Sequence, residues 1–97
     1  MIEKVFNSKK GVIHYWTSIV SGKRIWLVFL PGLTADHRLF EKQIEEFKDD
    51  YNLLVWDALG HGSSRPFELR YSLADQAEWL HSIMIHERIF KPVIIGH

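Results

Sequence analysis

Three short segments without polar alternation constrain the fold of this chain more than any other feature. Residues 25–30, 52–56 and 93–95 are almost entirely apolar, and each is followed by Pro, Asp or Gly. Strands that are apolar on both faces belong in a mostly parallel sheet whose two faces are both covered. Two segments with helical periodicity lie between these strands. This alternation favours right-handed crossovers and an α/β fold.

The two segments between the apolar strands predict helices. The first runs from about residue 37 to 48, and its apolar face comprises Phe40, Ile44 and Phe47. The second begins near residue 72, and its apolar face comprises Leu73, Ala77, Leu80 and Met84. We expect each helix to pack that face against the sheet.

A hairpin is predicted ahead of the parallel strands. Residues 2–6 and 12–19 are rich in β-branched and aromatic residues, and a Gly-containing turn at residues 7–11 separates them. The expected architecture is an antiparallel leading hairpin followed by parallel strands with crossover helices. Residues 93–95 would form an open sheet edge, which natural domains avoid because unpaired backbone groups invite aggregation. We therefore expect residues 1–97 to be a single partial domain, a fragment of a larger α/β core.

Charge balance and the absence of cysteine narrow the function classes. The chain has 12 basic and 12 acidic residues, which argues against a nucleic-acid or anionic-membrane partner because such surfaces need a basic excess. Without cysteine, disulfides and thiolate metal sites are excluded. The first residues lack a signal-peptide pattern, and the longest apolar run is far below the ~20 residues that span a bilayer. We expect a cytoplasmic protein.

Three motifs follow the apolar strands in order. They are Leu-Pro-Gly-Leu-Thr-Ala-Asp-His at residues 30–37, Asp-Ala-Leu-Gly-His-Gly-Ser-Ser at residues 57–64, and Val-Ile-Ile-Gly-His at residues 93–97. Together they resemble the α/β-hydrolase family. The first resembles its oxyanion loop, the second its Asp-x-x-Gly-x-Gly-x-Ser turn, and the third the start of its nucleophile elbow, Gly-x-Ser-x-Gly. The resemblance covers the whole chain, which would be the first third or so of a typical member.

The resemblance implies an oxyanion hole built partly from this chain. One backbone N–H donor would come from Leu33, directly after Gly32, and the other from the residue after the nucleophile. Gly96 would occupy the first small position of the elbow, and His97 the position just before the nucleophile. The nucleophile, the catalytic acid and the catalytic histidine would all lie beyond residue 97. We therefore expect the 97-residue chain to be inactive by itself.

The second motif is interpreted as a structural turn that lines the site. Its residues in this role are Asp57, Gly60, His61, Gly62 and Ser64. Asp57 is expected to hold the turn through backbone N–H groups, as aspartate commonly does. His61 is interpreted as a turn residue rather than a catalytic one, and His97 as a residue that lines the site. The resemblance implies no cofactor and no metal. The family often has histidine where this chain has Pro31, so the hydrogen bonds of that histidine are missing.

Two classes of function remain open. The resemblance implies a hydrolase that acts on a small-molecule substrate, a carboxylic ester or related acyl compound, through a nucleophile–histidine–acid triad. Other members cleave carbon–carbon bonds, epoxides or haloalkanes, so those reactions are alternatives. The other class is a non-catalytic truncated fragment that self-associates through its open sheet edge, or that complements a second chain there.

Overall fold

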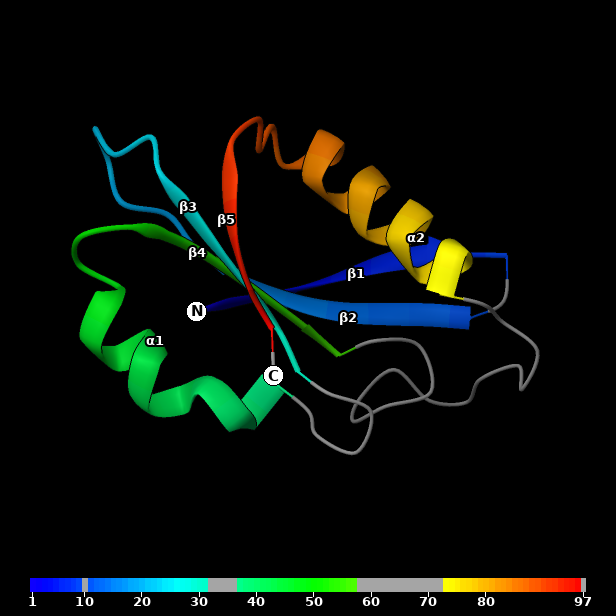
Figure 1. The fold of residues 1–97 in the computed structure, drawn as a ribbon, viewed down its shortest axis with the longest axis horizontal. Helices are drawn as coiled ribbons and strands as arrows, with labels where there is room; N and C mark the ends of the chain where they lie inside the picture. Colours follow the sequence, from blue (N-terminus) through cyan, green and yellow to red (C-terminus); the bar gives the residue numbers. More distant parts are fainter. Residues whose placement is uncertain (10, 32–36, 58–72, 97) are drawn as a thin grey trace.

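The described residues form one mixed five-stranded sheet (Figure 1). The computed structural model describes residues 1–9, 11–31, 37–57 and 73–96. The strands in spatial order are β1 (Ile2–Ser8), β2 (Gly11–Ser18), β4 (Asn52–Asp57), β3 (Trp26–Leu30) and β5 (Pro92–Gly96). β2 is antiparallel to both of its neighbours, whereas β3 runs parallel to β4 and β5. The predicted α/β architecture, with a leading hairpin and parallel strands, is confirmed.

The hairpin is longer at its turn than predicted. β1 continues to Ser8 because Asn7 pairs with Val12 and Ser8 pairs with Gly11. The Ser8 hydroxyl donates to the Gly11 carbonyl oxygen at 2.6 Å, which closes the turn with a side-chain hydrogen bond. Turn-forming residues therefore complete the ladder instead of ending it.

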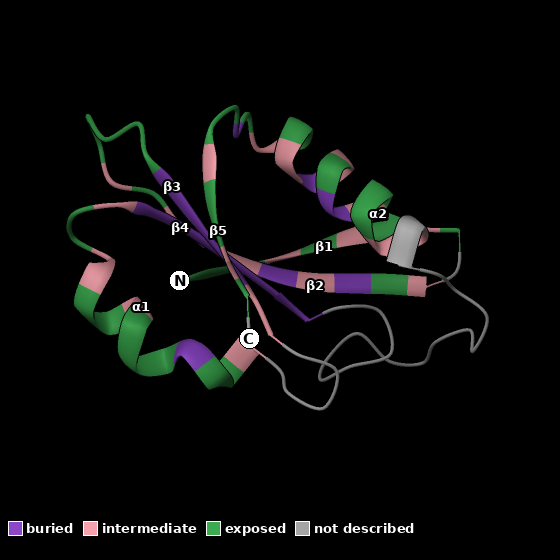
Figure 2. Cartoon of the chain, viewed as in Figure 1, coloured by how far each residue is buried: buried purple, intermediate pink, exposed green. Residues whose placement is uncertain are grey.

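The central strands bury both of their faces, as continuous apolar composition predicts. Successive side chains of a strand point to opposite faces. In β3, Trp26 and Val28 join one cluster of buried residues, and Leu27 and Phe29 join the other. β4 divides in the same way, and Figure 2 shows β3 and β4 as almost continuously buried. Each face of the sheet therefore has its own apolar core.

The first core lies under a short helical segment. This segment begins as a 3-10 turn, η1 (His37–Phe40), and continues as α1 (Glu41–Phe47). The Phe40 ring packs against Phe29 with centroids 5.0 Å apart, and Ile44 and Phe47 pack on the same cluster. The predicted apolar face of this helix is confirmed.

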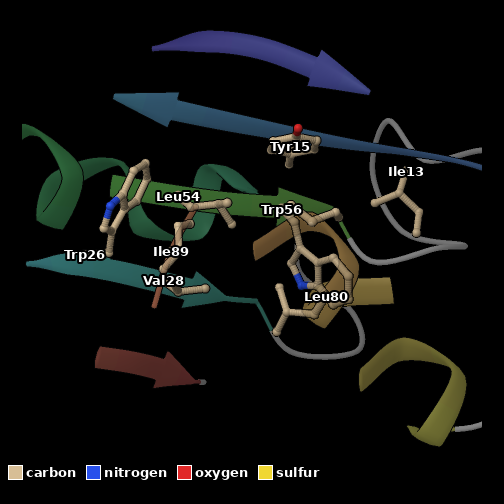
Figure 3. Close-up of a cluster of buried hydrophobic side chains, with 9 residues drawn as sticks. Ile13, Tyr15, Trp26, Val28, Leu54, Trp56, Leu80 and Ile89 are labelled. Carbon is tan, nitrogen blue, oxygen red and sulfur yellow. The ribbon is translucent and has the colours of Figure 1, made fainter. Parts of the chain in front are cut away.

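The second core lies under α2 (Leu73–His86) on the opposite face (Figure 3). Leu80 and Ile83 are its buried residues in this cluster, and Ala77 is exposed. The predicted apolar face was therefore wrong in part: it included Ala77 and omitted Ile83. Ala77 lies roughly 90° around the helix from the line that Leu80 and Ile83 define, because each residue turns the helix by about 100°. The side chain of Leu73 lies outside the described part.

The carboxyl end of α2 is closed by a backbone motif. Arg88 adopts a left-handed φ of 60°, and its N–H bonds the Ile85 carbonyl at 3.1 Å. The Ile89 N–H bonds the Met84 carbonyl at 2.8 Å, and the Ile89 side chain is buried. This is a Schellman motif with arginine at the position that glycine usually occupies.

A side-chain network fastens the end of α2 to the hairpin. Glu87 accepts a hydrogen bond from Lys4 Nζ at 2.8 Å and one from the Tyr15 hydroxyl at 2.7 Å. Burial by itself would raise the pKa of Glu87. The bonds from Lys4 and Tyr15 and the charges of Lys4 and His86 outweigh it, so the pKa lies below its ordinary value. Burial and the contact with Glu87 raise the pKa of Tyr15. Neither described helix has the length and apolarity needed to cross a membrane.

Candidate functional site at the carboxyl edge of the sheet

The parallel strands end together at one edge of the sheet. Leu30 at the end of β3 pairs with Gly96 at the end of β5, and Phe29 pairs with Val55 two residues before β4 ends at Asp57. In open α/β sheets ligands bind at the carboxyl ends of the strands. The first two motifs begin at this edge, with Leu30 and Asp57, and the third ends there. It is therefore the candidate site.

Two of the nine predicted site residues fall in the described part, Asp57 and Gly96. The other seven lie outside the described residues: Gly32, Leu33, Gly60, His61, Gly62, Ser64 and His97. Asp57 ends β4 and Gly96 ends β5, with β3 between them. Both residues therefore lie at the same edge of the sheet, but on strands that are not neighbours.

Gly96 has open space around it among the described atoms. A Cβ added there would meet no atom within 4 Å, and Gly96 does not have a left-handed φ. The described residues therefore leave room for a side chain at this position.

Asp57 is a fully buried carboxylate, with 0% of its surface exposed. Its Oδ1 accepts the backbone N–H of His37 at 2.6 Å. The His37 ring approaches the same carboxylate, with Nδ1 3.0 Å from each oxygen. Burying a charge is costly unless it is paired and hydrogen-bonded. Asp57 therefore ties the end of β4 to the first residue of η1.

This contact adds a partner to the expected role of Asp57. The aspartate holds the backbone N–H of His37, and the turn at residues 58–64 lies outside the described residues, so the expected role of Asp57 in that turn stays a prediction. Sequence reasoning missed His37, although it closes the first motif. Its ring contact joins two residues 20 positions apart, and neither helical nor strand periodicity indicates such a contact.

The His37 ring is also held by Trp16 of β2. The indole and imidazole rings are stacked, with centroids 3.7 Å apart and planes inclined by 23°. An ionised carboxylate only accepts hydrogen bonds, so Nδ1 of His37 is the donor toward Asp57. His14, the Cα partner of Asp57 in β2, continues the row beside Trp16 and contacts Glu3 at 3.0 Å. Elements β2, β4 and η1 thus meet at His37.

The described residues offer no cluster of three or more metal-binding side chains. Two surface hollows are lined entirely by described residues. One, of about 440 Å³, lies between the hairpin turn and α2. The other, of about 560 Å³, lies between residues 22–25 and residues 50–51. Neither is lined by Asp57 or His37, so the candidate site is defined by the sheet edge and not by either hollow.

A family model for the alpha/beta hydrolase fold matches residues 25–97, well over half of the chain. The chain belongs to the α/β-hydrolase family. The match begins just before β3, so it includes all three motifs and the Asp57–His37 contact. A comparison with curated protein sequences gave no match.

Solved structures of α/β hydrolases share the fold of this chain. MGS-M2, from a Medee basin deep-sea metagenome library, is 23% identical, with a TM-score of 0.84 over 96% of this chain and 34% of its own. A hydrolase from Novosphingobium aromaticivorans is 23% identical, with a TM-score of 0.86 over 98% and 34%. A mutant of the N-acyl homoserine lactonase AidH, complexed with N-hexanoyl homoserine lactone, is 21% identical, with a TM-score of 0.81 over 97% and 35%. The chain spans about a third of the length of these proteins.

Proposed function

We propose that this chain is the part of a hydrolase core that supplies one side of an oxyanion hole. The substrate would be a carboxylic ester or a related acyl compound. The nucleophile, histidine and acid of the triad would lie beyond residue 97. The observation that carries the proposal is the pairing of Leu30 with Gly96. Neighbouring strands lie about 4.8 Å apart. Donors on the two segments that leave these strand ends can therefore converge on one oxygen atom.

The proposed chemistry is acyl transfer in two steps. The nucleophile attacks the acyl carbon, and the carbonyl oxygen becomes the oxyanion of a tetrahedral intermediate. The Leu33 N–H, after Gly32, and the N–H after the nucleophile would stabilise that charge. The alcohol then leaves, and water releases the acid from the acyl-enzyme. Losing one such donor costs a factor of about 10²–10³ in rate.

One observation favours an acyl substrate within this family. One structure with the same fold is a lactonase bound to a homoserine lactone, and a lactone is a cyclic ester. Asp57, Gly60, His61, Gly62, Ser64, Gly96 and His97 would shape or line the site, without taking part in the chemistry.

The test uses the natural protein that contains residues 1–97, compared with the 97-residue chain alone. The intact mass of the natural protein establishes its length. We expect a fluorophosphonate probe to label it at the residue after His97, and we expect it to hydrolyse short p-nitrophenyl esters or acyl homoserine lactones. The 97-residue chain should do neither. Specific labelling of Ser63 or Ser64 in the short chain would contradict the proposal.

The alternative reactions of the family give a different result in the same test. Epoxide and haloalkane hydrolases use an aspartate as nucleophile, so a fluorophosphonate would leave such a protein unlabelled. Turnover of an epoxide or a haloalkane without ester hydrolysis would replace the acyl proposal with one of these reactions. Carbon–carbon bond cleavage would be recognised by its products.

A non-catalytic role for the short chain is favoured by one observation. β5 is an edge strand with no charged residue, and its Val93 and Ile94 are exposed. The opposite edge strand, β1, carries Glu3 and Lys4. Charges on an edge strand discourage pairing with other chains. We therefore expect the 97-residue chain to associate with a second copy of itself through β5.

Sedimentation velocity on two matched variants tests this association. Val93→Lys places a charge on β5 and should shift the chain toward the monomer. Val5→Lys places the same charge at a similarly exposed valine on β1 and should leave the association unchanged. A monomeric wild-type chain with a cooperative melt would contradict the expectation. A second chain that restores ester hydrolysis on mixing would indicate complementation instead.

A further inference from the structure

The connection between β3 and η1 is held at both of its ends. At one end Leu30 is fixed in the sheet by its pairing with Gly96. At the other end the His37 backbone N–H reaches Asp57 Oδ1 at 2.6 Å. The ring of the same residue adds Nδ1 contacts of 3.0 Å to both carboxylate oxygens and a stack on Trp16. At this second end the His37 ring therefore adds contacts with Asp57 and Trp16 to the backbone hydrogen bond.

We infer that His37 is a positioning residue whose ring fixes the far end of the connection that carries the proposed oxyanion donor. The inference deepens the proposed function and rests on it. A single N–H bond holds one point and leaves the chain free to rotate about it. A planar ring that meets a carboxylate at its edge and an indole on its face also fixes the orientation.

The groups that hold the ring belong to the rigid part of the molecule. Asp57 is fully buried at the end of β4, and Trp16 packs beside the core between α1 and the sheet. Sites supported by strands are held more accurately than sites supported by loops. A displacement of about 1 Å in a catalytic group can cost a factor of about 10² in rate. Through Asp57 and Trp16, His37 thus fixes the end of the connection relative to β4 and β2.

Three substitutions separate the two contacts of the ring. His37→Asn keeps a side-chain N–H for Asp57 and removes the stacked ring. His37→Phe keeps a flat ring for Trp16 and removes the hydrogen bond. His37→Ala removes both contacts, and the backbone N–H to Asp57 remains in all three variants. His81→Ala, at an exposed histidine of α2, is the matched control.

The experiment measures kcat and KM for a p-nitrophenyl ester with the natural protein that contains residues 1–97. We expect His37→Phe and His37→Ala to lower kcat by about 10- to 100-fold at unchanged KM, because the lost geometry matters only in the transition state. His37→Asn should recover most of kcat, since its amide reproduces the contact with Asp57. His81→Ala should match the wild type.

Each outcome has a distinct meaning. Wild-type protein that hydrolyses no ester overturns the proposed function, and this inference with it. Wild-type protein that is active, with His37→Phe and His37→Ala at full kcat, overturns the inference alone. If His37→Ala fails to fold, His37→Phe decides, with its thermal melt recorded so that kcat is measured on folded protein. A lower melting temperature with unchanged kcat would show that His37 only stabilises the fold.

Discussion

The two ends of β4 are each closed by a buried polar side chain, and the two side chains differ in charge. Asn52 begins the strand with 3% of its surface exposed, and Asp57 ends it with 0% exposed. Each accepts a backbone N–H from another segment, Val20 at 2.7 Å for Asn52 and His37 at 2.6 Å for Asp57. At each end of β4 a buried polar side chain therefore holds a backbone N–H of another segment. The side chain is an amide at the start of the strand and a carboxylate at its end.

The amide end has the simpler requirements. Asn52 Nδ2 donates to the Lys23 carbonyl at 2.9 Å, so one neutral side chain closes the turn between β2 and β3 from both sides. Gly22 in that turn has a φ of 82°, a conformation that glycine adopts without strain. This end does not need a charged group, and its partners are backbone atoms.

The carboxylate end needs more, because a buried charge loses far more hydration than an amide does. It recruits the ring of His37 in addition to a backbone N–H, and Trp16 holds that ring. The carboxylate end also lies at the edge where the first two family motifs begin and the third ends. β4 therefore carries a neutral tie at its start and a charged tie at its end, at the candidate site.

The largest expected effect is at the carboxylate end. Asp57→Ala removes the buried acceptor of the His37 backbone N–H and ring and should lower the free energy of unfolding by about 3 kcal/mol. Asp49→Ala, at an exposed aspartate in the turn after α1, is the control and should change it by less than about 0.5 kcal/mol. Urea unfolding of both variants at pH 7 measures the difference. Equal effects would remove the distinction between a buried tie and a surface charge.

A smaller loss is expected at the amide end. Asn52→Ala should lower the free energy of unfolding by about 2 kcal/mol, because two backbone groups lose a neutral partner. Asn52→Asp should lower it further, since one carboxylate oxygen would face the Lys23 carbonyl oxygen. Asn7→Ala, at an exposed position, is the control. The comparison fails if Asn52→Asp is as stable as the wild type, because a charge would then be tolerated equally at both ends.

The contribution of Glu87 to the free energy of unfolding should depend on pH. Its pKa is lowered in the folded chain, so its contribution to stability is present above the ordinary carboxyl pKa and is lost as the pH falls through the folded value. Glu87→Gln should therefore flatten the acid part of a stability–pH curve between about pH 5 and pH 2. Denaturant midpoints across this range measure the effect. If the low-pH part of the curve is unchanged in Glu87→Gln, the loss of stability in acid comes from groups other than Glu87.

The smallest expected effect is a gain. Arg88 has a left-handed backbone at the end of α2, which costs an L-residue about 1 kcal/mol and glycine very little. Arg88→Gly should therefore raise the free energy of unfolding by about 1 kcal/mol. Arg88→Ala retains the backbone cost and is the control. Thermal melts measure both, and the stabilised variant is also the background in which the Asp57 and Asn52 variants can be compared while folded.

Periodicity predicted the elements of this fold well, because it reports which side of an element is buried. The apolar segments became β3, β4 and β5, and the pattern of Phe40, Ile44 and Phe47 became the buried face of the first helical segment. The second helix was predicted with a rotated face, since Ala77 and Ile83 are both apolar and only packing distinguishes them. The insertion of β4 between β2 and β3 was not predicted, because pairing between distant segments leaves no periodic signal.

The site was less predictable than the fold. Asp57 was singled out from its motif, but its partner His37 lies on a different segment, and the contact arises only when β4 and η1 come together. The stack on Trp16 likewise depends on the position of β2. The partial-domain interpretation and the roles of Gly32 and Leu33 stay predictions.

The bond between Lys4 and Glu87 has a consequence for how the molecule is made. It joins residues 83 positions apart, so the ribosome releases the hairpin long before the residue that fastens it. At synthesis rates of about 5–20 residues per second, β1 and β2 wait for roughly several seconds with Ile13 and Tyr15 uncovered. Pauses in translation before residue 87 should lengthen that vulnerable period.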